Sequence, residues 1–222
     1  MEYAIVFLPL LGSFISGLFG KRLGDLNCQI LTSSLVAISG ILSLFIFYEV
    51  IFQDYSSNKL IFNWISSGNF HVNWSINIDP LTSVMLVVVS LISAIIHFYS
   101  IGYMDHDSHK PRFMAYLSLF TFAMLTLVTA DNFLQLFFGW EGVGLCSYLL
   151  IGFWYKKPSA NAAAIKAFIV NRVGDFGFAI GVFLIFFYYG SVNYQEVFQS
   201  TPQMIKEEIV FLGIELNLIT LI

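Results

Sequence analysis

Long apolar stretches separated by short polar segments dominate the chain. Six of them are long enough to cross a bilayer, at about residues 3–20, 30–52, 80–102, 113–130, 133–155 and 165–189, because a membrane helix needs roughly 20 mostly apolar residues. A seventh stretch, from Ile209 to Ile222, would rise only about 21 Å as a helix, short of the roughly 30 Å hydrocarbon core. The pattern predicts an all-α integral membrane protein with six complete transmembrane helices and a truncated seventh.

The composition indicates that lipid, rather than water, surrounds most of this chain. Of its 222 residues, 58% are hydrophobic and only 11% are charged, whereas soluble globular domains carry about 25% charged residues. The sequence also contains 24 Phe, and too few polar side chains remain to cover such an apolar core in water. The expected neighbour of most of the surface is therefore the lipid bilayer.

The Lys and Arg residues fall mainly in alternate loops. The first, third and fifth loops contain Lys21, Arg22, Lys110, Arg112, Lys156 and Lys157, whereas the intervening loops contain only Lys59 and Lys206. Because such residues accumulate on the cytoplasmic or matrix side, the N-terminus and the long loop at 53–78 are predicted to lie outside. The first span is not predicted to be a cleavable signal peptide, since its basic residues follow the apolar run.

Several classes of function are excluded by the sequence. The net charge is −4 and no basic patch with interleaved aromatics occurs, which excludes nucleic acid as a partner. Cys28 and Cys146 are too few and too far apart for an iron–sulfur cluster or a CxxC site. No Gly-rich dinucleotide fingerprint follows a strand. His106 and His109 lie in a polar loop without further ligands, so no metal site is predicted, and the chain is expected to hold no cofactor.

Four ionisable residues lie within the predicted spans: Glu141, Lys166, Arg172 and Asp175. Each costs about 2.5–3.5 kcal/mol on insertion scales, so intramembrane charges mark function more often than charges in soluble proteins do. Glu141 is eight residues into the fifth span and Asp175 about ten into the sixth, which places both carboxyl groups near the midplane. A carboxyl group at that depth can take up and release a proton. The alternative is a purely structural salt bridge between helices.

The two basic residues are expected to differ in role. Arg172 and Asp175 are three residues apart on one helix and can form an ion pair. Since arginine is effectively never deprotonated, Arg172 is predicted to keep Asp175 ionised instead of carrying a proton. Lys166 lies at the entry of its span, where its side chain can snorkel to the interface. We favour an interfacial anchor as the role of Lys166. It is nevertheless retained, together with Glu141, Arg172 and Asp175, as a candidate residue for proton translocation.

Small residues flank both carboxyl groups. Gly139, Gly142 and Gly144 lie near Glu141, and Gly174, Gly177 and Gly181 lie near Asp175. Because glycines let helices approach closely in lipid, tight helix packing is expected on both sides of the candidate site.

One stretch of the fifth span is highly distinctive. Residues 139–153 read Gly-Trp-Glu-Gly-Val-Gly-Leu-Cys-Ser-Tyr-Leu-Leu-Ile-Gly-Phe, followed in order by Lys166-Ala167-Phe168 and Asn171-Arg172-Val173-Gly174-Asp175. Upstream, the match extends to Asp79-Pro80-Leu81-Thr82 and Tyr116-Leu117-Ser118-Leu119-Phe120. These segments resemble the subunit L (chain 5) family of the proton-pumping NADH–quinone oxidoreductase, respiratory complex I. The resemblance covers essentially the whole chain and is strongest from about 79 to 190.

The resemblance implies a fold and a function. Members of the family contain two inverted repeats of five helices, each with a broken helix, an arrangement that places ion sites at the membrane midplane. It implies that the glutamate matching Glu141 pairs with a lysine on the seventh helix and gates a proton path, and that the aspartate matching Asp175 belongs to the same channel. It further implies that other subunits bind NADH, FMN, iron–sulfur clusters and quinone, and that this chain does no redox chemistry itself.

The sequence departs from the resemblance in length. Family members run to more than twice this length, so the chain is expected to hold helices 1–3 in residues 1–112 and an incomplete first repeat in residues 113–222. No lysine follows Lys206, so the partner lysine is missing, as are the second repeat and the lateral helix. One expectation is a second polypeptide that supplies the missing helices. The other is a truncated fragment without independent activity.

Two questions about function and location stay open at this point. A subunit of a multi-component Na⁺/H⁺ antiporter shares the buried glutamate, and a carboxylate that binds H⁺ does not exclude Na⁺. The charge pattern fits a bacterial inner membrane and a mitochondrial inner membrane alike, with the bacterial location favoured because no presequence is present. The expected partners are other membrane subunits of complex I.

Overall fold

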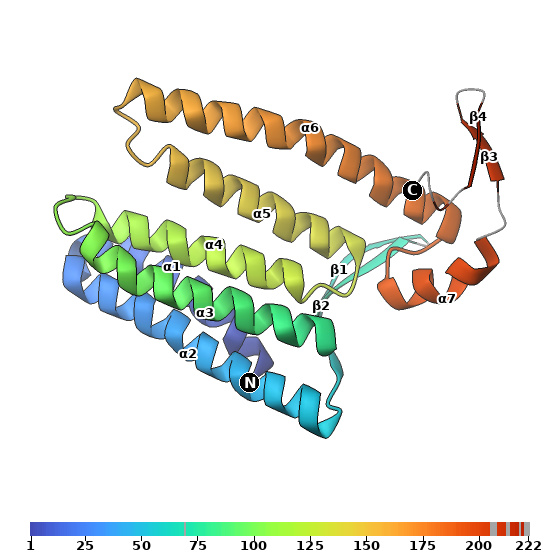
Figure 1. Cartoon of the computed structure of the whole chain (residues 1–222), viewed down its shortest axis with the longest axis horizontal. Coiled ribbons are helices and arrows are strands. Elements are labelled where there is room, and N and C mark those ends of the chain that lie inside the picture. The colour runs from blue at the N-terminus through green and yellow to red at the C-terminus, as the bar shows by residue number, and fades with distance from the viewer. Residues whose placement is uncertain (69, 205–207, 212–213, 218, 220–222) are drawn as a thin grey trace.

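The computed structural model describes residues 1–68, 70–204, 208–211, 214–217 and 219. Six long helices follow one another up and down through the molecule (Figure 1): α1 (Glu2–Leu23), α2 (Asp25–Gln53), α3 (Pro80–Tyr103), α4 (Lys110–Val128), α5 (Phe133–Ile151) and α6 (Pro158–Tyr189). Each is long and apolar enough to cross a membrane. The six predicted spans are therefore confirmed, although several of their ends differ.

The ends of α5 and α6 differ most from the predicted spans. α5 ends at Ile151 instead of about 155, because the chain turns at Gly152. α6 begins at Pro158 instead of about 165 and reaches 32 residues. Proline is well suited to the first position of a helix, but Ser159 and Asn161 interrupt the apolar run there, so hydropathy alone misses the first two turns.

The helix connections divide the bundle into two ends (Figure 1). The turns that join α1 to α2, α3 to α4 and α5 to α6 lie together at one end, here called the basic end because its connections and adjoining helix termini contain Lys21, Arg22, Lys110, Arg112, Lys156 and Lys157. The N-terminus, the β-strands and α7 (Tyr194–Met204) lie at the opposite end, here called the hairpin end. The predicted orientation would place the basic end on the cytoplasmic or matrix side.

At the hairpin end, the predicted external loop is an antiparallel β-hairpin. β1 (Ser57–Ser67) pairs with β2 (Phe70–Ile78), with Ser57 opposite Ile78. Trp64 of β1 and Trp74 of β2 pack on each other and on Phe138 of α5, with ring centroids 4.8 to 5.6 Å apart. The hairpin therefore covers the beginning of α5 instead of extending freely from the membrane.

The last part of the chain differs from the predicted truncated helix. After α7, the strands β3 (Glu208–Phe211) and β4 (Ile214–Asn217) pair antiparallel. Ile209, Val210 and Phe211 are β-branched or aromatic, and a short apolar run of that kind fits a strand as well as a helix. The prediction of a seventh helix is therefore wrong for residues 208–211 and 214–217. Lys206 and residues 220–222 lie outside the described residues.

Hydroxyl groups join the helices of the N-terminal bundle. α1 packs against α2 and α4, and α2 packs against α3. The Ser39 hydroxyl on α2 donates to the Ile5 carbonyl on α1 over 2.7 Å, and the hydroxyls of Ser43 and Ser90 lie 2.7 Å apart. Since lipid gives helices no hydrophobic reason to associate, small residues and hydrogen bonds hold such interfaces. Helices α1–α4 therefore form a bundle that is held together in part by hydrogen bonds between helices.

The last two long helices lie outside this bundle in successive layers. α5 packs on α4, and among the described elements α6 has its main contacts with α5. In Figure 1, α5 lies next to α4 at the side of the bundle, and α6 lies beyond α5. Large apolar side chains on the far face of α6 are exposed, among them Phe176, Phe183 and Phe187. That face is open to lipid or to further protein.

A glycine sets the distance between α4 and α5. A Cβ atom on Gly139 would lie 2.7 Å from the backbone N and Cα of Leu127, and one on Gly142 would lie 3.0 Å from the Ala123 Cβ. A Cβ on Gly144, Gly174 or Gly177 meets no described atom within 4 Å. The close packing expected at the glycines is therefore present between α5 and α4, and these three other glycines do not contribute to it.

Gly139→Ala is expected to lower the thermal stability of the protein, because the added methyl group overlaps the backbone of Leu127 and forces α4 and α5 apart. Overpacking of this kind costs about 1–3 kcal/mol. Thermal unfolding in detergent checks the prediction, with Gly144→Ala as the matched control, since its methyl group meets open space. Equal melting temperatures for the two variants would show that the α4–α5 contact is looser than described.

Candidate functional site

Polar contacts to the hairpin fix the beginning of α5. The Asn132 side-chain oxygen caps the helix by accepting from the Gln135 backbone N–H over 2.8 Å. The buried Gln135 side chain accepts from the N–H of Ser75 over 3.0 Å and donates to the carbonyl of Ser75 over 2.8 Å. It thus pairs with β2 as a neighbouring strand would. These contacts set the position of α5, and with it the position of Glu141 two turns further along.

Three of the four candidate charged residues meet between α5 and α6. Nη1 of Arg172 is in direct contact with Oε2 of Glu141, and it lies 3.4 Å from Oδ2 of Asp175. The contact with Asp175 is the ion pair that the three-residue spacing predicts. The contact with Glu141 joins two helices, and the sequence did not predict it. One guanidinium therefore bridges two carboxylates.

Trp140 completes the cluster from the α5 side. Its indole Nε1–H donates to Oδ1 of Asp175 over 2.8 Å. Asp175 thus has two partners and a side chain only 10% exposed, whereas Glu141 is 23% exposed and Arg172 is its one partner among the described residues. Sequence reasoning missed Trp140. The available signal was an indole N–H inside a span, which needs an acceptor.

Aromatic rings orient the guanidinium. The central carbon of Arg172 lies 4.6 Å from the ring centroid of Phe168, one turn back along α6. Phe168 packs in turn on Tyr148 of α5, at 5.3 Å between ring centroids. The ring face attracts the cation, so Arg172 is held toward α5 although its side chain is 42% exposed.

The charges of the cluster do not balance. With both carboxyl groups ionised, two negative charges face one positive charge, and an unbalanced charge within a membrane span is costly. The binding of one proton restores neutrality. Because Trp140 and Arg172 both hold Asp175, Glu141 is the group that accepts a proton with the loss of fewer contacts. The arrangement can therefore take up and release one proton.

Lys166 lies apart from this cluster. None of the ion pairs among the described residues involves it, and its side chain is exposed. Because α6 begins at Pro158, Lys166 is eight residues inside the helix instead of at its entry. It precedes Arg172 by about 9 Å along the helix axis. The structure thus brings together Glu141, Arg172 and Asp175 and leaves Lys166 out.

No metal centre is present among residues that the structure describes. No three His, Cys, Asp or Glu side chains gather closely enough to hold an ion. His109 has a surface contact instead, with Nδ1 2.8 Å from the Ser108 hydroxyl.

Comparison with known families identifies the chain. Residues 64–114 match the family described as NADH-ubiquinone oxidoreductase (complex I), chain 5 N-terminus, and residues 130–222 match the transmembrane family of NADH:quinone oxidoreductases and Mrp antiporters. NADH-ubiquinone oxidoreductase chain 5 of Chondrus crispus is 50% identical over 222 residues, which is all of this chain. The chain belongs to the chain 5 (subunit L) family of complex I.

The chain matches only part of the length of its chain 5 relatives. NADH-quinone oxidoreductase subunit L of Rickettsia bellii (strain RML369-C) is 49% identical over 215 residues, or 97% of this chain. The alignments cover 33% of the Chondrus protein and 34% of the Rickettsia protein. The chain therefore spans about a third of the length of the curated relatives it matches.

Solved structures share the fold at low sequence identity. An archaeal respiratory membrane complex, the membrane-bound sulfane sulfur reductase, contains a chain that matches with a TM-score of 0.76 at 16% identity, over 89% of this chain and 39% of that one. A chain of the Mrp complex from Dietzia sp. DQ12-45-1b matches with a TM-score of 0.73 at 23% identity, over 87% and 20% respectively. The chain thus shares its helical membrane fold with these two chains.

Proposed function

We propose that this chain forms part of the membrane arm of a proton-pumping NADH:quinone oxidoreductase and contributes a proton-translocation path. The observation that carries the proposal is the single guanidinium of Arg172 shared by Glu141 and Asp175 between two membrane-spanning helices. Such a site holds one negative charge in excess. It takes up one proton and releases it when the electrostatic potential around it changes.

Glu141 is the proton carrier in this mechanism. Protonation of Glu141 removes its attraction for Arg172, which then pairs with Asp175 alone, 3.4 Å away on the same helix. Loss of the proton draws Arg172 back to Glu141. The position of the guanidinium and the protonation of Glu141 are therefore coupled, while Trp140 keeps Asp175 in place as a fixed counter-charge. A lysine on a further helix, which the family resemblance implies, would favour release of the proton.

The proposed partners supply the redox chemistry and the remaining helices. Other subunits bind NADH, FMN, iron–sulfur clusters and quinone, and electron transfer there drives the change in potential. The exposed outer face of α6 supports packing against further protein, either a continuation of the chain or a second polypeptide. The two family matches, at 64–114 and 130–222, support the division into helices 1–3 and the beginning of a first repeat at about residue 113.

The proposed location is an energy-converting membrane. The six spans make the chain a multi-pass membrane protein, and its relatives come from bacteria and from eukaryotes. We favour the bacterial cytoplasmic membrane, with the mitochondrial inner membrane as the alternative.

A subunit of a Na⁺/H⁺ antiporter is the second candidate function, because the family matched by residues 130–222 includes Mrp antiporters. The geometry favours H⁺ over Na⁺. A proton binds one carboxylate oxygen, whereas Na⁺ needs several oxygen ligands and would be repelled by the guanidinium that already bridges Glu141 and Asp175.

The proposal predicts that the chain migrates with complex I on native gels of solubilised membranes, as shown by mass spectrometry. Inverted vesicles should acidify on addition of NADH in sodium-free medium, and deletion of the gene should lower the number of protons moved per NADH. Migration with antiporter subunits, with sodium-dependent activity, would favour the second candidate. Recovery of the chain only as a small free species would indicate an inactive fragment.

A further inference from the structure

A cavity lies at the basic end, where the beginnings of α4 and α6 meet the end of α5. Its volume is about 400 Å³, and its lining includes Arg112, Tyr116, Tyr148, Tyr155, Asn161 and Ile165. Tyr148 is two turns, or about 10 Å, along α5 from Glu141. The cavity is therefore distinct from the charged cluster to which we assign proton transfer.

Arg112 brings an unpaired positive charge to this cavity. Its Nη2 donates to the Phe153 carbonyl over 3.0 Å, and its central carbon lies 4.5 Å from the Phe153 ring centroid and 5.4 Å from that of Tyr155. No ion pair in the described part of the chain includes it, and its Nε is buried there without a hydrogen-bond partner. A guanidinium has five N–H donors in a planar fork that suits phosphate. Most of the donors of Arg112 are therefore available to an anion.

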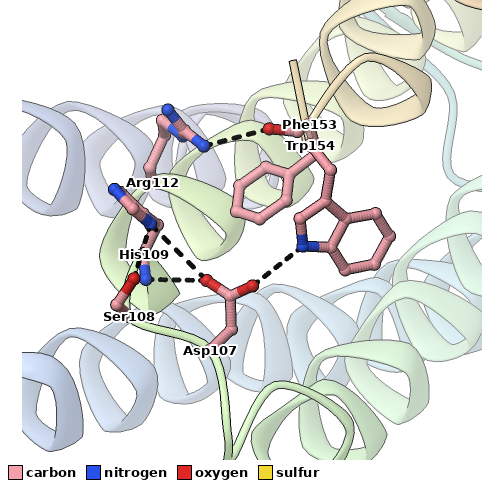
Figure 2. A network of polar contacts seen from close by, with 6 residues as sticks. All are labelled: Asp107, Ser108, His109, Arg112, Phe153 and Trp154. Carbon is pink, nitrogen blue, oxygen red and sulfur yellow. Dashed lines mark hydrogen bonds and ion pairs between the residues drawn. The ribbon is translucent and has the colours of Figure 1, made fainter. Parts of the chain in front are cut away.

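A network of polar contacts holds the Arg112 side chain and its neighbours in place (Figure 2). The Asp107 carboxylate accepts from the Trp154 indole N–H over 2.9 Å and from the His109 backbone N–H over 2.8 Å. Partial burial alone would raise the pKa of Asp107, but these hydrogen bonds hold the pKa below its ordinary value. Asp107 is thus hydrogen-bonded to Trp154 and His109, and it attracts Arg112 through space without forming an ion pair with it. The contact fastens the α5–α6 turn to the α3–α4 turn and fixes the Phe153 carbonyl that orients Arg112.

Further positive charges lie in the turn beside the cavity. Lys156 and Lys157 follow Tyr155 in the α5–α6 turn, and the Lys157 ammonium lies 5.0 Å from the Trp154 ring. The nearby acidic groups have their own partners, since Asp105 pairs with Lys110 at 3.5 Å and Asp107 is engaged as described. The local excess of positive charge attracts an anion.

The cavity opens onto exposed apolar surface. Its lining residues Tyr155 and Ile165 are 54% and 50% exposed, and the apolar surface continues through Leu145 on α5 and Ile169 on α6. A ligand that carries both a charged phosphate and long apolar chains matches this combination.

We infer that the cavity binds an anionic membrane phospholipid, with the guanidinium of Arg112 on the headgroup phosphate and the acyl chains along α5 and α6. Basic pockets between transmembrane helices at the cytoplasmic or matrix side suit such headgroups. Free phosphate shares the charge but leaves the adjoining apolar surface of Leu145, Ile165 and Ile169 uncovered, so the lipid is the better match. The bound lipid would brace the turn between the two helices that carry Glu141 and Arg172.

Native mass spectrometry of the full-length protein in its complex tests the inference. After exchange into nanodiscs of phosphatidylcholine with phosphatidylglycerol, the wild type should retain phosphatidylglycerol. Arg112→Gln should reduce the retained amount about fivefold or more. Lys21→Gln, which removes a charge from the same end but outside the cavity lining, should retain it as the wild type does. Addition of inorganic phosphate should not displace the lipid.

A second variant keeps the test decisive if Arg112→Gln fails to assemble. Ile165→Trp fills the exposed side of the cavity without a change of charge, and it should also release the lipid. Equal lipid retention in the wild type and both variants would overturn the inference, as would displacement by inorganic phosphate. A cysteine at position 165 that cross-links to another polypeptide in the intact complex would show that protein, not lipid, fills the cavity.

Discussion

Glu141→Gln is expected to abolish proton translocation through this site while α5 and α6 stay packed. The substitution preserves the size of the side chain but removes its charge, so Arg172 and Asp175 are left as a neutral pair that has no need of a proton. Proton movement assigned to this path should fall at least about tenfold, which corresponds to the loss of one favourable interaction of roughly 1.4 kcal/mol or more. NADH-driven acidification of vesicles reports proton translocation, and NADH oxidation measured in the same vesicles reports electron transfer.

The matched control for this experiment is Glu49→Gln. Glu49 lies near the hairpin end of α2, away from the α5–α6 interface, and loses the same charge on substitution. It should pump as the wild type does. If Glu141→Gln assembles normally and still pumps fully, Glu141 is a structural salt-bridge partner, and the proton path runs elsewhere.

Arg172→Gln is expected to impair both assembly and proton translocation. Two carboxylates would then face each other without a cation inside the membrane. Removal of one partner from a buried ion pair costs roughly 3–5 kcal/mol. The cost here should be smaller because the Arg172 side chain is 42% exposed. The amount of assembled complex on native gels and its melting temperature measure the effect.

The double variant Arg172→Gln/Asp175→Asn separates charge balance from proton transfer. It removes the charges of Arg172 and Asp175 and leaves Glu141 as the only ionisable group of the cluster. Assembly should recover relative to Arg172→Gln, because the repulsion between two carboxylates is gone, but pumping should not recover. Non-additivity of the two substitutions is the expected sign of a direct interaction. If both effects simply add, Arg172 and Asp175 act independently.

The positions of the six spans could be predicted from sequence because hydropathy depends only on local composition. The predicted ranges fail where local composition is ambiguous. The start of α6 contains Ser159 and Asn161, so its first turns look like a loop although Pro158 and the following alanines favour a helix. The apolar and β-branched residues of 208–211 and 214–217 fit a helix and a strand alike, and only the structure shows that these two ranges are strands.

The β1–β2 hairpin was predictable in principle. Aromatic and β-branched residues alternate with polar ones through Asn73-Trp74-Ser75-Ile76-Asn77-Ile78, and the two runs are separated by Gly68 and Asn69. Both features are hairpin signals. Hydropathy does not reveal them, because the segment connects two membrane spans and its polar residues are typical of a loop.

The candidate site was predictable only where its contacts are local. Arg172 and Asp175 pair because three residues on a helix bring side chains to one face. The contact between Glu141 and Arg172 depends on the register of α5 against α6, which is set by tertiary contacts such as that between Trp140 and Asp175. No sequence spacing encodes that register, so the bridge between the two carboxylates appears only in three dimensions.

The bridge by Arg172 also bears on how the protein is made. Helices enter a membrane in the order of synthesis, and Glu141 precedes Arg172 by 31 residues. α6 arrives with Arg172 and Asp175 already able to neutralise each other, whereas α5 arrives with a lone carboxyl group that costs about 2.5–3.5 kcal/mol in lipid unless it is protonated. The newly inserted α5 is therefore stabilised when it packs against α6, so the contact to which we assign proton transfer would first favour association of the two helices.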